Sequence, residues 1–152
     1  MGTYNLEIKN YYALVSLHKS LLEAKFNLSP DNEDISGSPL VAELYTEVTD
    51  LLLNSEKRLE WEKWLQLKNR PDYRKRAVLR MKKCNRWANV TLETKREIAR
   101  IYLSPFKFSE TELDEVIKEV DEAIIPEKTS EKSILEEVEN SSVAFCYGHR
   151  WQ

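Results

Sequence analysis

Apolar residues recur every three or four positions along much of this chain, and this spacing predicts an all-α fold. The strict alternation of apolar and polar residues that is typical of a half-buried strand is missing. The clearest helical segment covers residues 5–26. Its apolar stripe comprises Tyr4, Ile8, Tyr11, Val15, His18, Leu22 and Phe26. We therefore predict a first helix there, followed by a polar loop over residues 28–38, which are rich in Pro, Gly, Asp and Asn.

Ser38 and Pro39 have the pattern of a helix start. A serine side chain accepts a hydrogen bond from a free backbone N–H of the first turn, and proline fits the first helical position. A second helix is therefore predicted from this point to about residue 53. Its inward-facing residues are expected to be Val41, Leu44, Tyr45, Val48, Leu51 and Leu52.

Two tryptophans indicate where this second helix ends. If it continued, Trp61 and Trp64 would lie nearly opposite its apolar stripe, and a globular helix buries one stripe. We therefore predict a break at Asn54 and Ser55, with Ser55 capping a third helix over 56–69. Both tryptophans are expected in the core, because large aromatic side chains dominate the interiors of small domains.

Three further helices are predicted in the second half of the chain. Pro71 opens a fourth helix, at about 71–88, and Thr91 caps a fifth, which ends before Ser104. The sixth helix has the strongest start signal, since Ser109 and Glu112 form the pair of a capping box. Phe108 and Leu113 occupy the positions of a hydrophobic staple at the same start, and Pro126 is expected to end this helix.

The length and composition fit one soluble domain. A chain of 152 residues with 41% hydrophobic and 32% charged residues buries enough surface for a real core. We expect one compact bundle of about six mostly antiparallel helices over residues 1–126. Residues 127–152 are expected to form a polar linker, which is partly mobile or contains a short helix, and an aromatic C-terminal tail.

The expected cellular location rests on two features that the sequence lacks, a secretory signal and a membrane-spanning segment. The first residues have no basic region followed by an apolar one, so no secretory signal is expected. No apolar run approaches the roughly 20 residues that a membrane span needs. The expectation is a cytoplasmic protein with no membrane partner.

Charge is spread unevenly along the chain. Residues 57–100 contain 15 of the 23 Lys and Arg residues and 5 of the 26 Asp and Glu residues, which is a net charge of +10. The segment before them has a net charge of −6 and the segment after them −7, so the whole chain has −3. Such asymmetry is typical of partner binding or of internal charge pairing.

The predicted fourth helix is the candidate partner-binding site. Its members are Lys75, Arg76, Leu79, Arg80, Lys82, Lys83, Arg86 and Trp87. On a regular helix most of them would fan over the face opposite the inner stripe, with Arg80 beside Trp87, where its guanidinium could stack on the indole. A broad basic face bordered by an aromatic ring suits an acidic protein surface or a phosphate backbone. The alternative is an ordinary solvated face, or one that pairs internally with the acidic sixth helix.

An acidic protein surface is the favoured partner over nucleic acid. The overall charge is negative, whereas nucleic-acid-binding domains are usually basic, and no nucleic-acid-binding motif is complete. A nucleic-acid-associated regulator that uses the basic helices at 71–103 is the alternative function. A membrane surface ranks below both, because the inner stripe of the fourth helix is needed for the core.

No chemistry of catalysis or metal binding is indicated. The sequence has two histidines and three glycines, and it contains no GxGxxG, GxxxxGK[ST] or HExxH motif. His18 lies on an apolar stripe and is expected in the core. Cys146 and His149 have a Cys-x-x-His spacing, but a zinc site needs three or four ligands. The sequence therefore predicts no enzyme, cofactor or metal, and favours a protein that binds a protein partner, such as an inhibitor, an immunity or antitoxin-like protein, an adaptor or a regulator.

Overall fold

The computed structural model describes residues 2–131, with side chains described up to residue 124. Within this part the chain is all-α, as predicted, and contains no strand. The helices are α1 (Tyr11–Phe26), α2 (Pro39–Leu53), α3 (Arg58–Trp64), α4 (Pro71–Lys82), α5 (Leu92–Leu103) and α6 (Glu110–Glu131). Two short 3₁₀ turns, η1 (Leu67–Asn69) and η2 (Trp87–Asn89), precede and follow α4.

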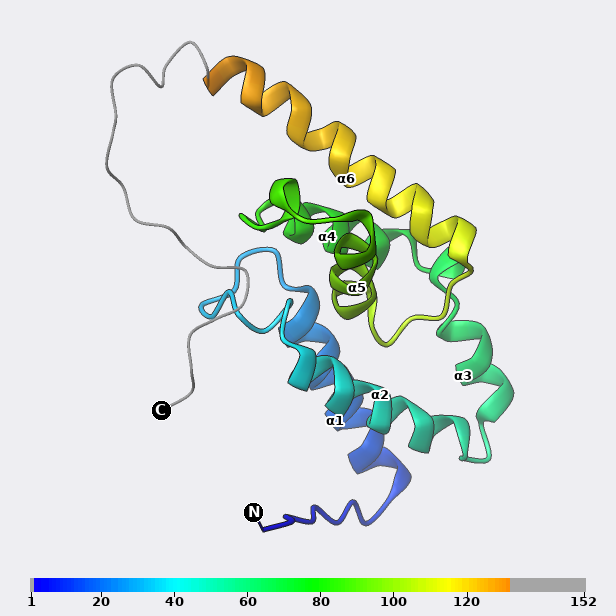
Figure 1. The fold of residues 1–152 in the computed structure, drawn as a ribbon. Coiled ribbons are helices and arrows are strands. Elements are labelled where there is room, and N and C mark those ends of the chain that lie inside the picture. The colour runs from blue at the N-terminus through cyan, green and yellow to red at the C-terminus, as the bar shows by residue number, and fades with distance from the viewer. Residues whose placement is uncertain (1, 132–152) are drawn as a thin grey trace.

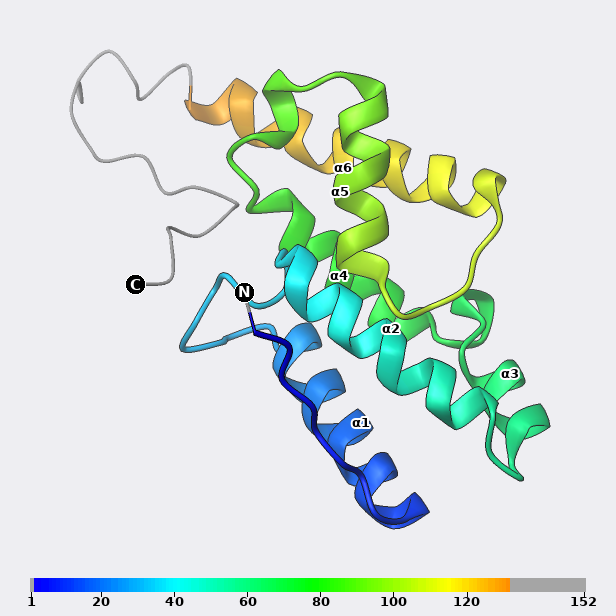
Figure 2. The same cartoon turned by 60° about the horizontal axis from the view of Figure 1, so that its bottom comes forward.

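The helices surround α4. Helices α1 and α2 pack side by side in opposite directions, and α4 and α5 lie between this pair and α6 (Figures 1 and 2). Helix α4 contacts α1, α5, α6 and η1. The fully buried side chains at the centre include Tyr45, Leu52, Leu65, Met81, Ala99, Leu103, Leu113, Val116 and Val120. One continuous core therefore joins elements from both halves of the chain.

Helix α1 begins later than its apolar spacing predicts. The side-chain oxygen of Asn10 accepts a hydrogen bond from the backbone N–H of Ala13 at 2.9 Å, which caps the helix there. Residues 2–9 are not helical, and Tyr4 is 95% exposed. The predicted start at residue 5 is wrong. The apolar residues before Asn10 have helical spacing, but the cap that Asn10 forms fixes the start of the helix after them.

Helix α2 has the predicted bounds but a narrower buried face. Ser38 caps it by accepting a hydrogen bond from the N–H of Val41, and Pro39 is its first residue. Tyr45, Val48 and Leu52 are buried. Leu44 and Leu51, which the sequence predicted to face inward, are exposed, because no element of the described chain covers that side of α2.

The predicted third helix is much shorter than expected. A break does occur at Asn54, but α3 begins at Arg58 and ends at Trp64. The backbone then pairs with a distant segment instead of continuing the helix. The N–H of Leu67 donates to the carbonyl of Lys107, and the N–H of Lys107 donates to the carbonyl of Leu65.

Helix α6 begins as predicted and ends later. The Ser109 hydroxyl accepts from the N–H of Glu112 at 3.1 Å, and the Glu112 carboxylate accepts from the N–H of Ser109 at 2.7 Å, which completes the capping box. The predicted end at Pro126 is wrong, since α6 continues to Glu131. The φ angle of proline is compatible with a helix. Within α6 it therefore removes one backbone hydrogen-bond donor and crowds the preceding turn, but it does not have to end the helix. The linker and tail predicted beyond this point fall mostly on residues 132–152, which lie outside the described residues.

Candidate protein-binding surfaces

The eight predicted partner-binding residues do not form one exposed face. Lys75, Lys83 and Arg86 are exposed, whereas Arg76, Leu79 and Lys82 are half-buried. Arg80 and Trp87 are buried. The reason is the central position of α4, which is enclosed by its neighbours on most sides despite being rich in basic residues. Of the predicted basic face, only three basic residues are exposed, one on α4 and two just after its end.

Trp87 is buried in the core, so this predicted partner-binding residue contributes no exposed surface. Helix α4 ends at Lys82, so Trp87 lies in η2 and no longer follows the helical spacing of α4. Its indole N–H donates to Oδ1 of Asp121 at 2.7 Å. The cation over its ring is Lys95, at 5.6 Å, and the predicted stacking of Arg80 is not formed.

Arg80 is also part of the interior. One guanidinium nitrogen, Nη2, donates to the backbone carbonyl of Glu33 at 3.4 Å, so this arginine ties α4 to the loop before α2. Its Nε and Nη1 atoms are buried without a hydrogen-bond partner. Burial removes Arg80 from any binding surface, and its two unpaired nitrogens lower the free energy of unfolding because they have lost water without gaining a partner.

Internal pairing uses part of the positive charge of the basic middle segment. Among the described side chains, four ion pairs connect this segment to α6: Arg74 with Glu119, Lys95 with Asp121, Arg96 with Asp114, and Arg100 with Glu110. The last three come from α5, and their partners follow in reverse order along α6, which α5 crosses (Figure 2). Pairing with the sixth helix therefore occurs, but through three residues of α5 and through Arg74, none of which belongs to the predicted basic face of the fourth helix.

The histidine of α1 lies in an aromatic cluster, as predicted for a core residue. His18 is 2% exposed, and its Nδ1 lies 2.9 Å from the hydroxyl of Tyr45. Trp61 and Trp64 contact its ring edge-on, with centroids 4.9 and 4.8 Å away. Burial, with a smaller contribution from the nearby charge of Lys19, lowers the pKa of His18 to about 4, so the imidazole is neutral at pH 7.

Lys25 is a buried cation that the sequence analysis did not identify. Its side chain is 1% exposed and donates to three backbone carbonyls, those of Ser36, Ile101 and Tyr102. The last two belong to the C-terminal turn of α5, where carbonyls have no partner within the helix. Lys25 therefore caps a distant helix, and burial lowers its pKa to about 7. No local sequence signal could have revealed this contact.

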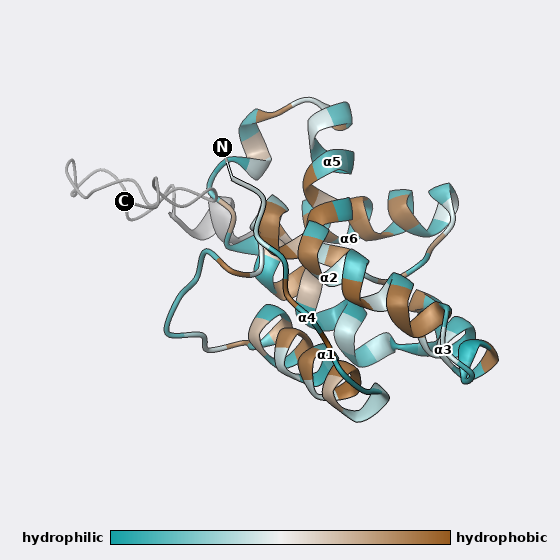
Figure 3. Ribbon diagram, turned by 90° about the horizontal axis from the view of Figure 1, so that it is seen from below, coloured by the Kyte–Doolittle hydropathy of each residue, from teal (hydrophilic) through white to brown (hydrophobic). Residues whose placement is uncertain are grey.

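An exposed apolar stripe runs along α2. Leu40, Leu44 and Leu51 are 67%, 44% and 50% exposed, and their spacing places them on one line of the helix. Glu43, Glu47 and Asp50 are exposed beside them. Hydrophobic and hydrophilic segments accordingly alternate along α2 in the view from below (Figure 3). We refer to these leucines and carboxylates as the α2 stripe.

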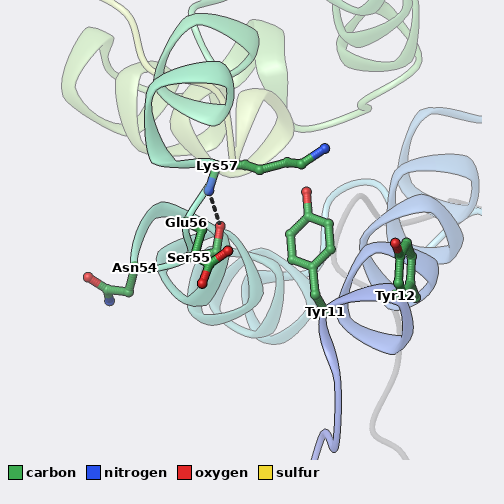
Figure 4. A pocket seen from close by; sticks show the side chains of 6 residues that line it. All are labelled: Tyr11, Tyr12, Asn54, Ser55, Glu56 and Lys57. Atoms are coloured by element: carbon green, nitrogen blue, oxygen red, sulfur yellow. Dashed lines mark hydrogen bonds between the residues drawn. The ribbon is translucent and has the colours of Figure 1, made fainter.

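A shallow pocket lies at the end of α2, with a volume of about 560 Å³. It is lined by Tyr11, Tyr12, Asn54, Ser55, Glu56 and Lys57. Figure 4 shows the Tyr11 ring directed toward Lys57, while Tyr12 lies on the outer side of α1. The ammonium of Lys57 is 5.9 Å from the centre of the Tyr11 ring, and the Tyr11 hydroxyl accepts from the indole of Trp61.

Neither a metal site nor a membrane-spanning helix is found among the described residues. No group of three or more His, Cys, Asp or Glu residues in this part of the chain could hold a metal ion. His149 and Cys146 lie outside it. None of the helices described here combines the length and apolar character that crossing a membrane requires.

Comparison of the chain with protein-family models, curated proteins and solved structures finds no match.

Proposed function

We propose that this protein is a non-enzymatic cytoplasmic protein that acts by binding a protein partner, and that the α2 stripe is its main docking surface. The observation that carries the proposal is the line of three exposed leucines on a regular helix. Contiguous apolar surface on a soluble domain is typical of protein interaction sites. Inhibitors, immunity or antitoxin-like proteins, adaptors and regulators all work by such binding.

The rigidity of α2 supports this role. The helix is capped by Ser38 at its start, and its opposite face is fixed in the core through Tyr45, Val48 and Leu52. A partner would therefore meet an ordered surface and would not have to pay for ordering it. Covering the exposed part of each leucine would contribute on the order of 1 kcal/mol.

The test compares two sets of leucine substitutions. We expect affinity capture with the parent protein to retain a discrete partner that the double variant Leu44→Ser, Leu51→Ser loses. The matched control is Leu59→Ser, Leu92→Ser, which changes two exposed leucines outside α2. The purified partner should then bind the stripe variant at least about tenfold more weakly than the control, as for loss of an apolar anchor. Equal capture by both variants would contradict the proposal.

The exposed lysines on α4 and just after its end are a second candidate surface, suited to an acidic protein. Lys75 and Lys83 are exposed and take part in none of the ion pairs formed between described residues. We expect Lys75→Gln, Lys83→Gln to slow association with such a partner without lowering the melting temperature, because surface charge steers encounter.

Lys19→Gln, Lys118→Gln is the control for this experiment, since both lysines are exposed on other helices. If generic DNA or RNA binds instead, with an affinity that falls steeply as salt rises, the nucleic-acid alternative is the correct one. Unchanged association with the acidic partner would remove α4 as a binding surface.

A further inference from the structure

The α2 stripe combines apolar and acidic rows in a fixed order. Leu40, Leu44 and Leu51 form one row, and Glu43, Glu47 and Asp50 lie on one side of it, at helical spacing. The other side of the leucine row is bounded by Val41 and Val48, which lead into the core. A partner that covers the leucines therefore also comes close to the carboxylates, which lie along one edge of the leucine row.

Within the described part of the chain, these carboxylates have no cationic partner. None of the ion pairs between described residues includes Glu43, Glu47 or Asp50. Helix α2 contains no Lys or Arg, and its last turn has no basic residue to offset the negative end of the helix dipole. The nearest cation along the chain, Lys57, lies beyond Asn54 with its ammonium over the Tyr11 ring. The acidic row is thus an uncompensated negative edge.

Docking would remove water from this edge. Carboxylates that lose water without gaining a cation oppose binding, because the desolvation penalty is then not offset. A neutral or acidic apolar partner would meet this penalty. A partner with cations beside its apolar row would instead form ion pairs with all three carboxylates.

A second copy of this chain does not fit the same requirement. In an antiparallel twofold pairing of two α2 helices, both acidic rows fall on the same side and repel each other. In a parallel twofold pairing the rows fall on opposite sides, and neither copy of α2 provides a cation for the other. The charge of α2 therefore disfavours a dimer through this surface.

We infer that the occupant of the α2 stripe is a cationic amphipathic segment, with an apolar row against Leu40, Leu44 and Leu51 and Lys or Arg residues against Glu43, Glu47 and Asp50. This inference rests on the proposed function, since it names the partner of the same surface. Beyond the proposed function, we infer that the acidic row makes the surface prefer positively charged partners.

The experiment uses a display library of random peptides long enough to span α2. Peptides are selected on the full-length protein and counter-selected on Leu44→Ser, Leu51→Ser. We expect the leucine-dependent peptides to carry net positive charge and apolar residues at helical spacing. Their affinity should fall about tenfold on Glu43→Gln, Glu47→Gln, Asp50→Asn, and their salt dependence should weaken. The control Glu23→Gln, Glu97→Gln, Glu115→Gln removes three exposed carboxylates from other helices and should bind as the parent does.

Three other outcomes would contradict either the cationic partner or the docking surface itself. If leucine-dependent peptides show no excess of positive charge, or bind the acidic-row variant as tightly as the parent, the cationic partner is wrong and the docking surface stands. If sedimentation shows a dimer that Leu44→Ser, Leu51→Ser abolishes, the occupant is a second copy. If neither peptides nor self-association depend on the leucines, the proposed function itself fails.

Discussion

At the scale of single residues, burial determines what the polar side chains of this protein can do. His18 and Lys25 both lie on α1, and both are removed from water by packing. His18 is neutral at pH 7 and shares a hydrogen bond with Tyr45. Lys25 satisfies carbonyls of another helix. Their shared role is to hold α1 against neighbouring elements, with no exposed atom for a ligand.

The His18–Tyr45 hydrogen bond gives a double-mutant prediction. His18→Leu should lower the free energy of unfolding by about 1–3 kcal/mol, because it leaves the buried hydroxyl of Tyr45 without a partner. Adding Tyr45→Phe should recover part of that loss, since both polar groups are then absent. Urea denaturation of the parent, both single variants and the double variant measures the coupling. Additive losses would show that the two side chains do not interact.

At the scale of helices, α6 is held mainly by its charged edges and its buried stripe. Leu113, Val116, Ile117 and Val120 face the core. Carboxylates beside this stripe pair with α4 and α5. One of them differs from the rest, because Oδ1 of Asp121 accepts from both the buried Trp87 indole and the Lys95 ammonium, each at 2.7 Å.

This difference predicts unequal effects of two similar substitutions. Asp121→Ala should destabilise the protein by about 1–3 kcal/mol, because it leaves a buried indole N–H without an acceptor. Asp114→Ala removes the exposed pair with Arg96 and should leave the melting temperature almost unchanged, because exposed ion pairs add little stability. Thermal melts of both variants test the ranking. Equal melting temperatures would mean that Asp121 is an ordinary surface carboxylate.

At the scale of the whole molecule, the two buried bases couple stability to pH. Their pKa values are lowered on folding, from 6.5 to about 4 for His18 and from 10.5 to about 7 for Lys25. In each case the unfolded chain binds a proton more readily than the folded protein does. Stability therefore rises with pH, over about pH 4 to 6.5 through His18 and over about pH 7 to 10.5 through Lys25.

Removal of Lys25 should abolish the upper part of this dependence. Between pH 8 and 9.5 the parent should gain up to about 1.4 kcal/mol per pH unit relative to Lys25→Met, because the unfolded lysine stays protonated while the folded one does not. Lys19→Met, an exposed lysine of the same helix, should keep the parent's dependence. Urea denaturation across this pH range measures the difference. Parallel curves for Lys25→Met and the parent would show that Lys25 is protonated and solvated in the folded protein.

The charge asymmetry of the chain also has its explanation at this scale. The basic middle segment and the acidic segment after it meet across the interface of α6 with α4 and α5. Part of the basic charge of the middle segment is therefore used within the fold. The negative edge that stays uncompensated lies on α2, in the acidic first segment of the chain.

The sequence by itself determined the helical class and most helix starts. Caps at Ser38, Thr91 and Ser109 depend on hydrogen bonds over three residues, so they are readable from neighbouring positions. It did not determine which apolar residues are covered. Leu44 and Leu51 match the buried stripe of α2 in spacing, and only the placement of the other helices leaves them exposed.

Tertiary structure alone decided the contacts between distant segments. Lys25 meets Ile101 and Tyr102, and Trp87 meets Asp121, across long stretches of chain. The pairing of Leu65 and Leu67 with Lys107 shortened the third helix in the same way. Local spacing reports which hydrogen bonds neighbouring residues can make. The burial of a lysine, the end of a helix and the exposure of a leucine depend on which segments pack together, and that is a property of the complete fold.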